Sequence, residues 1–434
     1  MDKPLKIVHI VPGSGGTFYC QNCLRDSAMV QCLRGMGHDV MIVPLYLPLF
    51  TDAPQLTEDK PVFFGGINIY LQQKIPFFRW TPRWFDRLFD HPWLLRRAAK
   101  QEGSTSAAAL GDMTLSMLQG RAGHQRKEID RLITWMVEQE RPDGVYLSNA
   151  LLSGLAPPLK EALDVPIVCA LQDEDTWLDA MGSPYDERCW AAMSENGRSI
   201  DSFAAVSAWY ADKMQGRMSV PADRVTHLPL AIELTDEPPA PLDFNPPTIG
   251  FLSRLSEGQG LGLLVDAFLE LKKRPGLEQL RLKATGGITP ADESFLANLR
   301  TKLEQHGVAE DVEFLTDFER PARHAFLRSL SMLSVPALRG EAFGAFILEA
   351  LQFGVPVVQP DAGAFREVVE NTQGGVVYTP HTVGALADAL ADLLLNPEHA
   401  RALGQRGRDI VLRDYGMQRM ARDLLRLFAG LQST

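Results

Sequence analysis

Two glutamates in the stretch EAFGAFILE, Glu341 and Glu349, are the residues of this 434-residue chain best suited to chemistry. In one continuous helix, eight steps of about 100° would leave them roughly 80° apart around the axis and about 12 Å apart along it. A sugar hydrolase needs its two carboxyl groups about 5 to 9.5 Å apart, so this spacing argues against hydrolysis. If Glu341 instead lies in a loop and a helix starts near Gly344, the two carboxylates would meet opposite ends of an elongated ligand.

The backbone amides between the two glutamates complete this pattern. The N–H groups of Phe343, Gly344 and Ala345 would point at anionic groups, because the first amides of a helix have no partner within it. Hydroxyl groups at both ends and anionic groups between them are the features of a nucleotide sugar. The alternative is a solvated glutamate beside a helix start and a second one on an exposed helical face.

Strands alternate with helical segments along most of the chain, which predicts parallel sheets covered by helices on both faces. The stretch LKIVHIVP reads as a buried strand, residues 18–36 as a helix, and HDVMIVPLY as the next strand. This is how a nucleotide-binding α/β domain begins. The fold class is therefore α/β, with two Rossmann-like domains facing a central cleft.

Proline recurs in ELTDEPPAPLDFNPP too often for a helix or a central strand, which places a linker between two domains. A chain of 434 residues also exceeds the size at which one core keeps growing. We expect an N-terminal, acceptor-side domain over 1–235, a linker over 236–247, and a nucleotide-sugar-binding domain over 248–416. Residues 417–434 form an amphipathic pattern, and we expect this last helix to pack back on the first domain.

A long segment over 45–123, rich in aromatic and basic residues, interrupts the alternation in the first domain. Six Lys and Arg residues stand against two Asp between positions 79 and 100. One interpretation is a solvated helical pair that covers the domain. The other is a surface over 76–100 for an anionic acceptor or for lipid head groups, with tryptophans at the interface.

The net charge of −11 argues against a general nucleic-acid binder, which needs a basic face. The first residues run directly into a strand pattern, and no stretch reaches 18 uninterrupted apolar residues. Five cysteines, an odd number, fit a reducing compartment better than a disulfide framework. We therefore expect a cytoplasmic protein.

The C-terminal half resembles the family 4 glycosyltransferases of the GT-B fold, and the resemblance extends over nearly the whole chain. In that family a sugar is transferred from a nucleotide donor (a UDP-, GDP- or ADP-sugar) with retention at the anomeric carbon. The resemblance implies that Glu341 contacts hydroxyls of the donor sugar and Glu349 those of the ribose. It is carried by Pro336, Glu341, Phe343-Gly344, Glu349-Ala350, Gly354, Pro356-Val357 and the stretch from Gly363 to Glu367.

Further positions match the same family. Gly15 and Gly16 correspond to the glycine loop whose backbone approaches the diphosphate, with a structural tight turn as the alternative. Arg254 corresponds to the diphosphate-binding arginine, and a guanidinium suits that bidentate contact. Phe18 stands where a dinucleotide fingerprint needs a third glycine, which disfavours nicotinamide chemistry.

The chain also departs from the family at several positions, which puts its rate, its donor and its activity in question. Arg339, two residues before Glu341, could replace one missing positive charge, or could be a solvated loop residue. The departures are Gln259 for lysine, Ser253 for glycine, Gln172 for histidine, and Leu230-Ala231 for Asn-Gly.

In transfer without an external base, the acceptor proton passes to the departing phosphate oxygen, so stabilising charge on the diphosphate is the main task. Arg254 and the backbone amides would share this task, and Asp173 is a further catalytic candidate. Asp173 and Asp175 could instead hold a divalent metal, although a solvated acidic loop is the simpler interpretation. We expect no metal and no cofactor, since the nucleotide sugar is a substrate.

Cys20 and Cys23 form a Cys-x-x-Cys motif next to the glycine loop. Zinc would need two more ligands, and only Cys32 and His38 lie nearby. A thiol redox pair is a second interpretation, because helix N-termini favour thiolates. Packing of two small apolar side chains is the leading one.

Three functions fit these residues. The first is a hexosyltransferase that acts on an unidentified glycan, lipid or small-molecule acceptor without a metal. The second is a degenerate sugar-nucleotide-binding or scaffold protein of the same fold with little turnover. The third, a two-domain dehydrogenase, would require saturable NAD binding.

Overall fold

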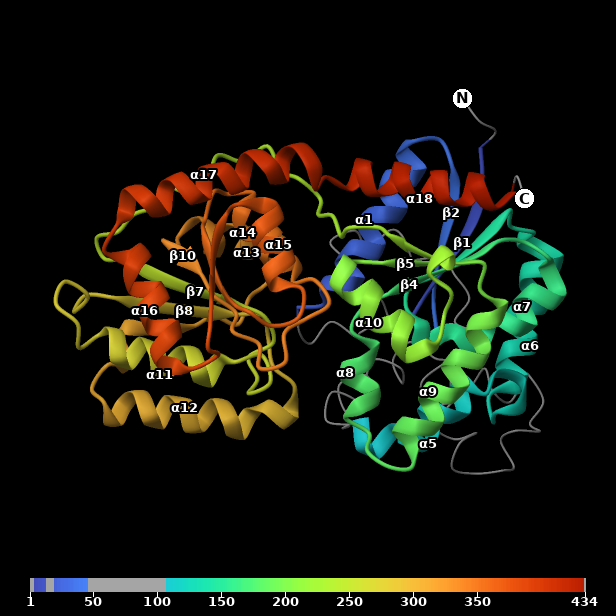
Figure 1. The fold of residues 1–434 in the computed structure, drawn as a ribbon, viewed down its shortest axis with the longest axis horizontal. Helices are drawn as coiled ribbons and strands as arrows, with labels where there is room; N and C mark the ends of the chain where they lie inside the picture. Colours follow the sequence, from blue (N-terminus) through green and yellow to red (C-terminus); the bar gives the residue numbers. More distant parts are fainter. Residues whose placement is uncertain (1–3, 13–18, 46–106, 433–434) are drawn as a thin grey trace. The chain divides into compact units, whose positions relative to one another are not determined.

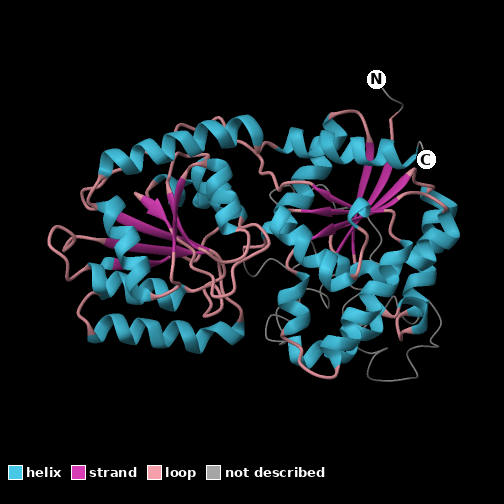
Figure 2. Cartoon of the chain, viewed as in Figure 1, coloured by secondary structure: helices cyan, strands magenta, loops and turns pink. Residues whose placement is uncertain are grey.

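A computed structural model describes residues 4–12, 19–45 and 107–432 of the chain. These residues form two compact units (Figure 1). The first unit contains 4–12, 22–45, 107–229 and 420–432, and the second contains 230–419 together with Tyr19, Cys20 and Gln21. Helices lie on both faces of the sheet in each unit (Figure 2).

The first unit is built on a six-stranded parallel sheet with the order β2-β1-β3-β4-β5-β6. Its central strands are apolar and buried on both faces, as expected for a sheet covered on two sides. The strands are β1 (Lys6–Val11), β2 (Asp39–Pro44), β3 (Gly144–Leu147), β4 (Ile167–Leu171), β5 (Ser202–Ala205) and β6 (Val225–His227).

Eight α-helices of the described chain accompany this sheet. They are α1 (Gln21–Gly35), α5 (Ala107–Leu118), α6 (Arg126–Trp135), α7 (Ala156–Leu163), α8 (Glu174–Asp179), α9 (Tyr185–Asn196), α10 (Ala208–Met218) and α18 (Met417–Gln432). Helix α18 packs on the first unit, as the sequence predicted. A Cβ added at Gly144 of β3 would lie 2.6 Å from the ring of Phe428, so the glycine leaves the space that this buried ring fills.

The second unit has its own six-stranded parallel sheet, in the order β12-β11-β10-β7-β8-β9. From β7 the chain first builds outward through β8 and β9, then returns to β10 on the other side of β7 and continues outward. The sheet therefore has a topological switch point between β7 and β10. Its strands are β7 (Thr248–Leu252), β8 (Arg281–Thr285), β9 (Val312–Phe314), β10 (Met332–Leu333), β11 (Val357–Pro360) and β12 (Gly375–Tyr378).

The helices of the second unit lie between these strands and after them. Helix α11 packs on α16, and α17 packs on both α14 and α15. They are α11 (Leu261–Leu271), α12 (Glu293–Gln305), α13 (Arg320–Arg328), α14 (Ala345–Leu351), α15 (Phe365–Thr372), α16 (Val383–Leu394) and α17 (Pro397–Asp414).

The two parallel-sheet α/β units confirm the fold class predicted from the sequence. Residues 236–247 contain no helix or strand beyond one isolated bridge between Phe244 and Pro247, while the exact domain limits stay a prediction. Strand β10 covers only Met332 and Leu333, so it is shorter than the stretch SMLSVPAL suggested. No helix of the described residues is both long and apolar enough to cross a membrane.

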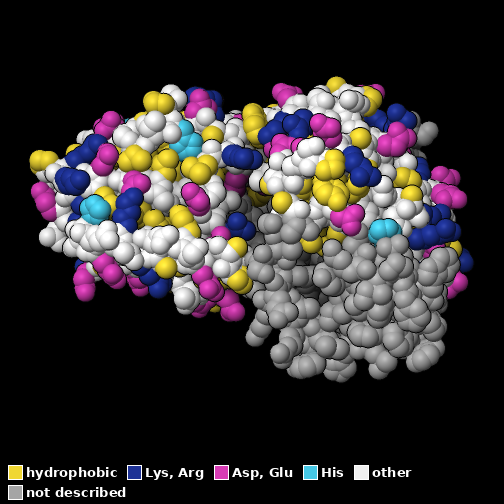
Figure 3. Space-filling model, turned by 90° about the horizontal axis from the view of Figure 1, so that it is seen from below, with side chains coloured by type: hydrophobic (Ala, Val, Ile, Leu, Met, Phe, Trp, Pro, Cys, Tyr) yellow, Lys and Arg dark blue, Asp and Glu magenta, His cyan; other side chains and the backbone are white. Residues whose placement is uncertain are grey.

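Figure 3 shows basic and acidic side chains interspersed over the described part of one face. The excess negative charge of the chain is thus not gathered into one patch on that visible surface.

Candidate functional site

The two loops at the switch point of the second sheet carry the residues singled out from the sequence. Arg254 follows β7, and Glu341 follows β10. These strands are parallel neighbours, so both loops leave from the same edge of the sheet. In open α/β sheets, ligands bind at this edge and at the switch point.

Close backbone packing positions Glu341. Gly363 has a φ of 59°, and a Cβ added there would lie 2.5 Å from the carbonyl oxygen of Glu341. The N–H of Ala364 donates to that same oxygen at 2.9 Å. The loop after β10 is thus held against the start of α15, at a distance that only glycine allows.

Helix α14 begins at Ala345, directly after Gly344, whose φ is 88°. Glu341 therefore lies in the loop and Glu349 in the helix, which is the second of the two arrangements considered from the sequence. Both are buried, with 9% and 7% of their surface exposed. The ring of Phe343 is also buried and lies 6.4 Å from the ring of Tyr415, so this side chain packs in the second unit.

Both oxygens of the Glu349 carboxylate accept hydrogen bonds. The hydroxyl of Tyr19 donates to Oε1 at 2.7 Å, and Nε of Arg323 donates to Oε2 at 2.8 Å. Burial, and then the charge of Glu349, raise the pKa of Tyr19 well above its ordinary value. The phenol therefore stays protonated and serves as a donor.

Gln21 contacts Glu341, the other of the two glutamates. Its Nε2 donates to Oε2 of Glu341 at 3.2 Å, and its Oε1 accepts from the N–H of Ala345 at 2.6 Å. Tyr19 and Gln21 are two positions apart, yet they contact Glu349 and Glu341 respectively. The two carboxylates and the Ala345 amide therefore face the same small region of the second unit.

Arg254 is a partly exposed cation in the loop after β7. Its side chain is 43% exposed, and its Nε lies 3.5 Å from the carboxylate of Asp292. Gln259, which stands where the family has lysine, is half-buried, and its Oε1 has no hydrogen-bond partner. It adds no charge beside Arg254.

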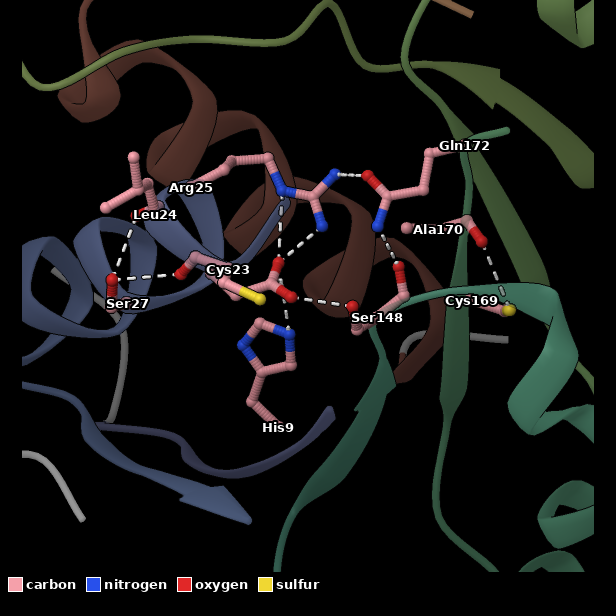
Figure 4. A network of polar contacts seen from close by, with 10 residues as sticks. His9, Cys23, Leu24, Arg25, Ser27, Ser148, Cys169, Ala170 and Gln172 are labelled. Atoms are coloured by element: carbon pink, nitrogen blue, oxygen red, sulfur yellow. Dashed lines mark hydrogen bonds and ion pairs between the residues drawn. The ribbon is translucent and has the colours of Figure 1, made fainter. Parts of the chain in front are cut away.

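The first unit contains a separate buried polar network around Gln172 (Figure 4). Oε1 of Gln172 accepts from Arg25, and its Nε2 donates to the carbonyl oxygen of Ser148 at 2.6 Å. Asp26 accepts from Nε of Arg25 at 3.0 Å and from the Ser148 hydroxyl at 2.6 Å. Both ends of the Gln172 amide are thus engaged, so this replacement for the family histidine holds β3, β4 and α1 together.

The acidic residues after β4 are also largely engaged. Glu174 is buried and accepts from the backbone N–H groups of Ala150 and Gln172 at 2.8 and 2.7 Å and from the Tyr210 hydroxyl at 2.8 Å. Burial raises its pKa to about 7. Oδ1 of Asp175 lies 2.9 Å from the same Tyr210 oxygen.

Asp173 lies just before α8 in the first unit, with a φ of 59°. Its neighbour Asp175 pairs with Lys213. Among the described residues, no group of three or more His, Cys, Asp or Glu is arranged to hold a metal ion. The catalytic role of Asp173 stays a prediction.

Several predicted features lie outside the described residues, namely Gly15, Gly16 and the surface over 76–100. Conversely, sequence reasoning missed Tyr19, Gln21 and Arg323. The position of the first two just after the glycine loop is the one signal that could have indicated them. No pattern in the sequence pairs Arg323 with Glu349.

Cys20 and Cys23 are disulfide-bonded, whereas Cys32, Cys169 and Cys189 are free. The chain has five cysteines, so Cys20 and Cys23 are bonded to each other. The expectation that they pack as reduced apolar side chains is therefore wrong. A spacing of three residues at a helix start brings the two sulfurs within bonding distance.

Two family models match adjoining parts of the chain. The glycosyl transferase 4-like domain matches residues 27–231, and the model of the glycosyl transferases group 1 matches residues 235–410. The chain belongs to the family 4 glycosyltransferases.

Among curated relatives, a GDP-mannose-dependent alpha-(1-6)-phosphatidylinositol monomannoside mannosyltransferase from Mycobacterium tuberculosis is 32% identical over 191 residues. This match covers 42% of this chain and 48% of the relative. A D-inositol 3-phosphate glycosyltransferase from Corynebacterium jeikeium is 30% identical over 164 residues, or 38% of this chain and 39% of the relative. The chain thus spans about half or less of the length of these relatives.

Solved structures match along almost the whole chain. A sucrose-phosphate synthase from Thermosynechococcus elongatus superposes with a TM-score of 0.72 at 16% identity, covering 99% of both chains. HepE from Anabaena, solved in complex with UDP, gives a TM-score of 0.64 at 14% identity, covering 98% of this chain and 100% of HepE. At these identities the likeness establishes the fold.

Proposed function

We propose that this protein is a retaining hexosyltransferase that moves a sugar from a nucleoside diphosphate to an acceptor hydroxyl. One observation carries the proposal: Glu341, Glu349 and the Ala345 amide converge on one region at the switch point of the second sheet. A ligand there would need hydroxyl groups at two ends and acceptor oxygens between them. A nucleotide sugar has this pattern.

Each residue takes one part of the donor. Glu341 accepts hydrogen bonds from hydroxyls of the sugar, and Glu349 accepts them from the ribose, since a carboxylate can accept from two vicinal hydroxyls. The Ala345 amide and Arg254 contact the diphosphate. Gly15 and Gly16 keep the role implied by the family resemblance.

In the transfer, the bond from the anomeric carbon to the phosphate oxygen breaks as a new bond to the acceptor oxygen forms. The acceptor proton moves to the departing phosphate oxygen. Negative charge grows on the diphosphate, and Arg254 stabilises it in a geometry fixed before the reaction. Because Arg254 and the amide already supply these contacts, we expect transfer to need no metal and to persist in excess EDTA.

GDP-mannose is the first donor to test, because the curated relatives include enzymes named for it. Their names also make inositol- and lipid-containing acceptors the first acceptors to screen. A cytoplasmic location, where sugar nucleotides are available, belongs to the same proposal.

The experiment is a thermal-shift screen of GDP-mannose, UDP-glucose and ADP-glucose on the full chain under reducing conditions, followed by product analysis with the donor that binds. Glu349→Ala should weaken nucleotide binding, whereas Glu341→Ala should mainly lower the rate of transfer. Glu370→Ala is the matched control, because this glutamate lies exposed on α15 beside Arg366.

Equal donor affinity and turnover in the two site variants and the control would contradict the assigned roles. Saturable nucleotide-sugar binding with no hydrolysis and no transfer to any acceptor would favour the degenerate binding protein instead. The engaged Gln172 and the uncharged Gln259 are the observations that keep this second function worth testing.

A further inference from the structure

The proposed donor site is already filled by side chains of this chain. The Tyr19 hydroxyl holds Oε1 of Glu349, and Arg323 holds Oε2. Tyr19 is 4% exposed, so its ring also fills the space beside the carboxylate. If Glu349 accepts from the ribose, the ribose and Tyr19 compete for it.

Gln21 fills the other part of the same site. Its amide nitrogen donates to Glu341, as a sugar hydroxyl would, and its amide oxygen accepts from the Ala345 N–H, as a phosphate oxygen would. The backbone N–H of Tyr19 donates to the carbonyl oxygen of Gly286 at 2.9 Å, which anchors the segment in the second unit. Tyr19 and Gln21 together present the donor and acceptor groups that a nucleotide sugar would present.

The residue between them is Cys20, and its disulfide partner Cys23 lies in the first turn of α1. Cys20 is partly exposed and Cys23 is buried. The disulfide closes the chain on itself over three residues, so the backbone that carries Tyr19 and Gln21 has fewer conformations available. We expect this constraint to favour the conformation in which both side chains fill the site.

We infer that the Cys20–Cys23 disulfide is a redox site that controls access of the nucleotide sugar, an inference that rests on the proposed function. A dithiol, of the kind that thioredoxin-like proteins carry, attacks one sulfur through its thiolate. The Cys20–Cys23 bond breaks, two electrons and two protons pass to this protein as two thiols, and the attacking dithiol becomes a disulfide. Tyr19 and Gln21 are then free to leave Glu349 and Glu341.

The position of the motif favours this chemistry. Cys20 is partly exposed, so the thiolate of an attacking dithiol can reach a sulfur of the bond. In a cytoplasmic protein a disulfide is usually transient and serves catalysis or sensing.

The test measures GDP binding to the full chain by calorimetry, in the air-oxidised state and after dithiothreitol. Alkylation followed by mass spectrometry establishes each state, since three thiols are free in the oxidised chain and five after full reduction. We expect reduction to tighten GDP binding about tenfold or more, because the nucleotide no longer has to break the contacts of Tyr19 and Gln21. UDP and ADP are measured in the same way.

Variants separate the contributions. Cys20→Ser and Cys23→Ser should bind the nucleotide as the reduced protein does, with or without oxidant. Cys32→Ser, which removes a free and partly exposed thiol of α1, should keep the full redox response. The double variant Tyr19→Ala, Gln21→Ala should bind tightly even when oxidised, because the ring beside Glu349 and the hydrogen bonds to both glutamates are gone.

Equal affinity of the oxidised and reduced protein would overturn this inference and leave the proposed function standing. A redox response that survives in Cys20→Ser would also overturn it. No binding of any of the three nucleotides in either state would contradict the proposed function itself, and this inference with it.

Discussion

Arg323 and Glu349 form a buried ion pair, with side chains 4% and 10% exposed. Replacing Arg323 by Met should lower the free energy of unfolding by about 3 kcal/mol, because it leaves a buried carboxylate without its cationic partner. Urea denaturation followed by circular dichroism measures the change.

Arg320→Met is the control for that substitution. Arg320 pairs with Glu233 at 2.9 Å, but the two side chains are 30% and 46% exposed. Removing a partly exposed ion pair of this kind should lower the free energy of unfolding by less than about 1 kcal/mol. A similar loss in both variants would show that burial does not set the strength of the Glu349 pair.

Two buried groups of the first unit respond to pH in opposite directions. Burial lowers the pKa of His9 to about 4, against the opposing charge of Asp26, and burial raises the pKa of Glu174 to about 7. His9 has a higher pKa in the unfolded chain than in the folded one. Lowering the pH from about 6.5 to 4 therefore destabilises the fold through this residue. Glu174 has a higher pKa in the folded chain than in the unfolded one. Lowering the pH from about 7 to 4.5 therefore stabilises the fold through this residue.

The two effects oppose each other in the wild-type protein between about pH 4.5 and 6.5. We expect Glu174→Gln to lose stability on acidification more steeply than the wild type, by up to about 1.4 kcal/mol per pH unit. His9→Gln should change in the opposite sense relative to the wild type. Denaturant unfolding at several pH values tests both, and parallel curves for the three proteins would contradict the assignment.

At the scale of elements, Gly363 couples the loop after β10 to α15. Gly363→Ala should lower both the stability and the rate of transfer, because the new Cβ would collide with the backbone of Glu341. Gly384→Ala is the matched control. Gly384 lies exposed in α16 with nothing within 4 Å of an added Cβ, so alanine there should be neutral or stabilising by up to about 1 kcal/mol.

The test compares the rate of sugar transfer and the thermal unfolding of Gly363→Ala with those of Gly384→Ala. If Gly363→Ala retained wild-type turnover, the close approach at Glu341 would have no part in positioning its carboxylate.

The elements themselves could be predicted from local patterns. Apolar runs bounded by glycine and proline located β1 and β7, and periodicity located α11 and α18 to within a few residues. Strand β10 was overestimated, because an apolar run does not reveal where ladder hydrogen bonds stop. The loop position of Glu341 was one of two alternatives left by the sequence, and the start of α14 at Ala345 decides between them.

The contacts of the site could not be predicted in this way. The Tyr19 hydroxyl and Glu349 are 330 positions apart, and Arg323 reaches Glu349 from a different helix. Such pairs depend on the order of the strands, which no local pattern specifies. The disulfide was missed for another reason, since a Cys-x-x-Cys motif alone does not reveal its oxidation state.

At the scale of the whole molecule, nucleotide binding should affect the two units unequally. Under reducing conditions, GDP should slow amide hydrogen exchange in the loop over 336–344 and in α14. The sheet strands β3 to β6 of the first unit should change little, because the described residues assigned to the nucleotide lie in the second unit. Saturating ligand, at about 100 times its dissociation constant, stabilises the state that it binds by about 2.7 kcal/mol.

Hydrogen exchange read by mass spectrometry, with and without GDP, tests this expectation. Protection confined to the first unit would place the nucleotide elsewhere and contradict the assigned site.

The packing of α18 has a consequence for how the protein is made. Phe428 covers Gly144 of β3, and Leu424 and Ala421 are buried in the same helix, so the first sheet is covered by residues translated almost three hundred positions later. When the ribosome has synthesised β1 to β6, it has not yet synthesised α18, the last helix that covers them. Until α18 has been made, the first sheet exposes apolar strand surface to chaperones.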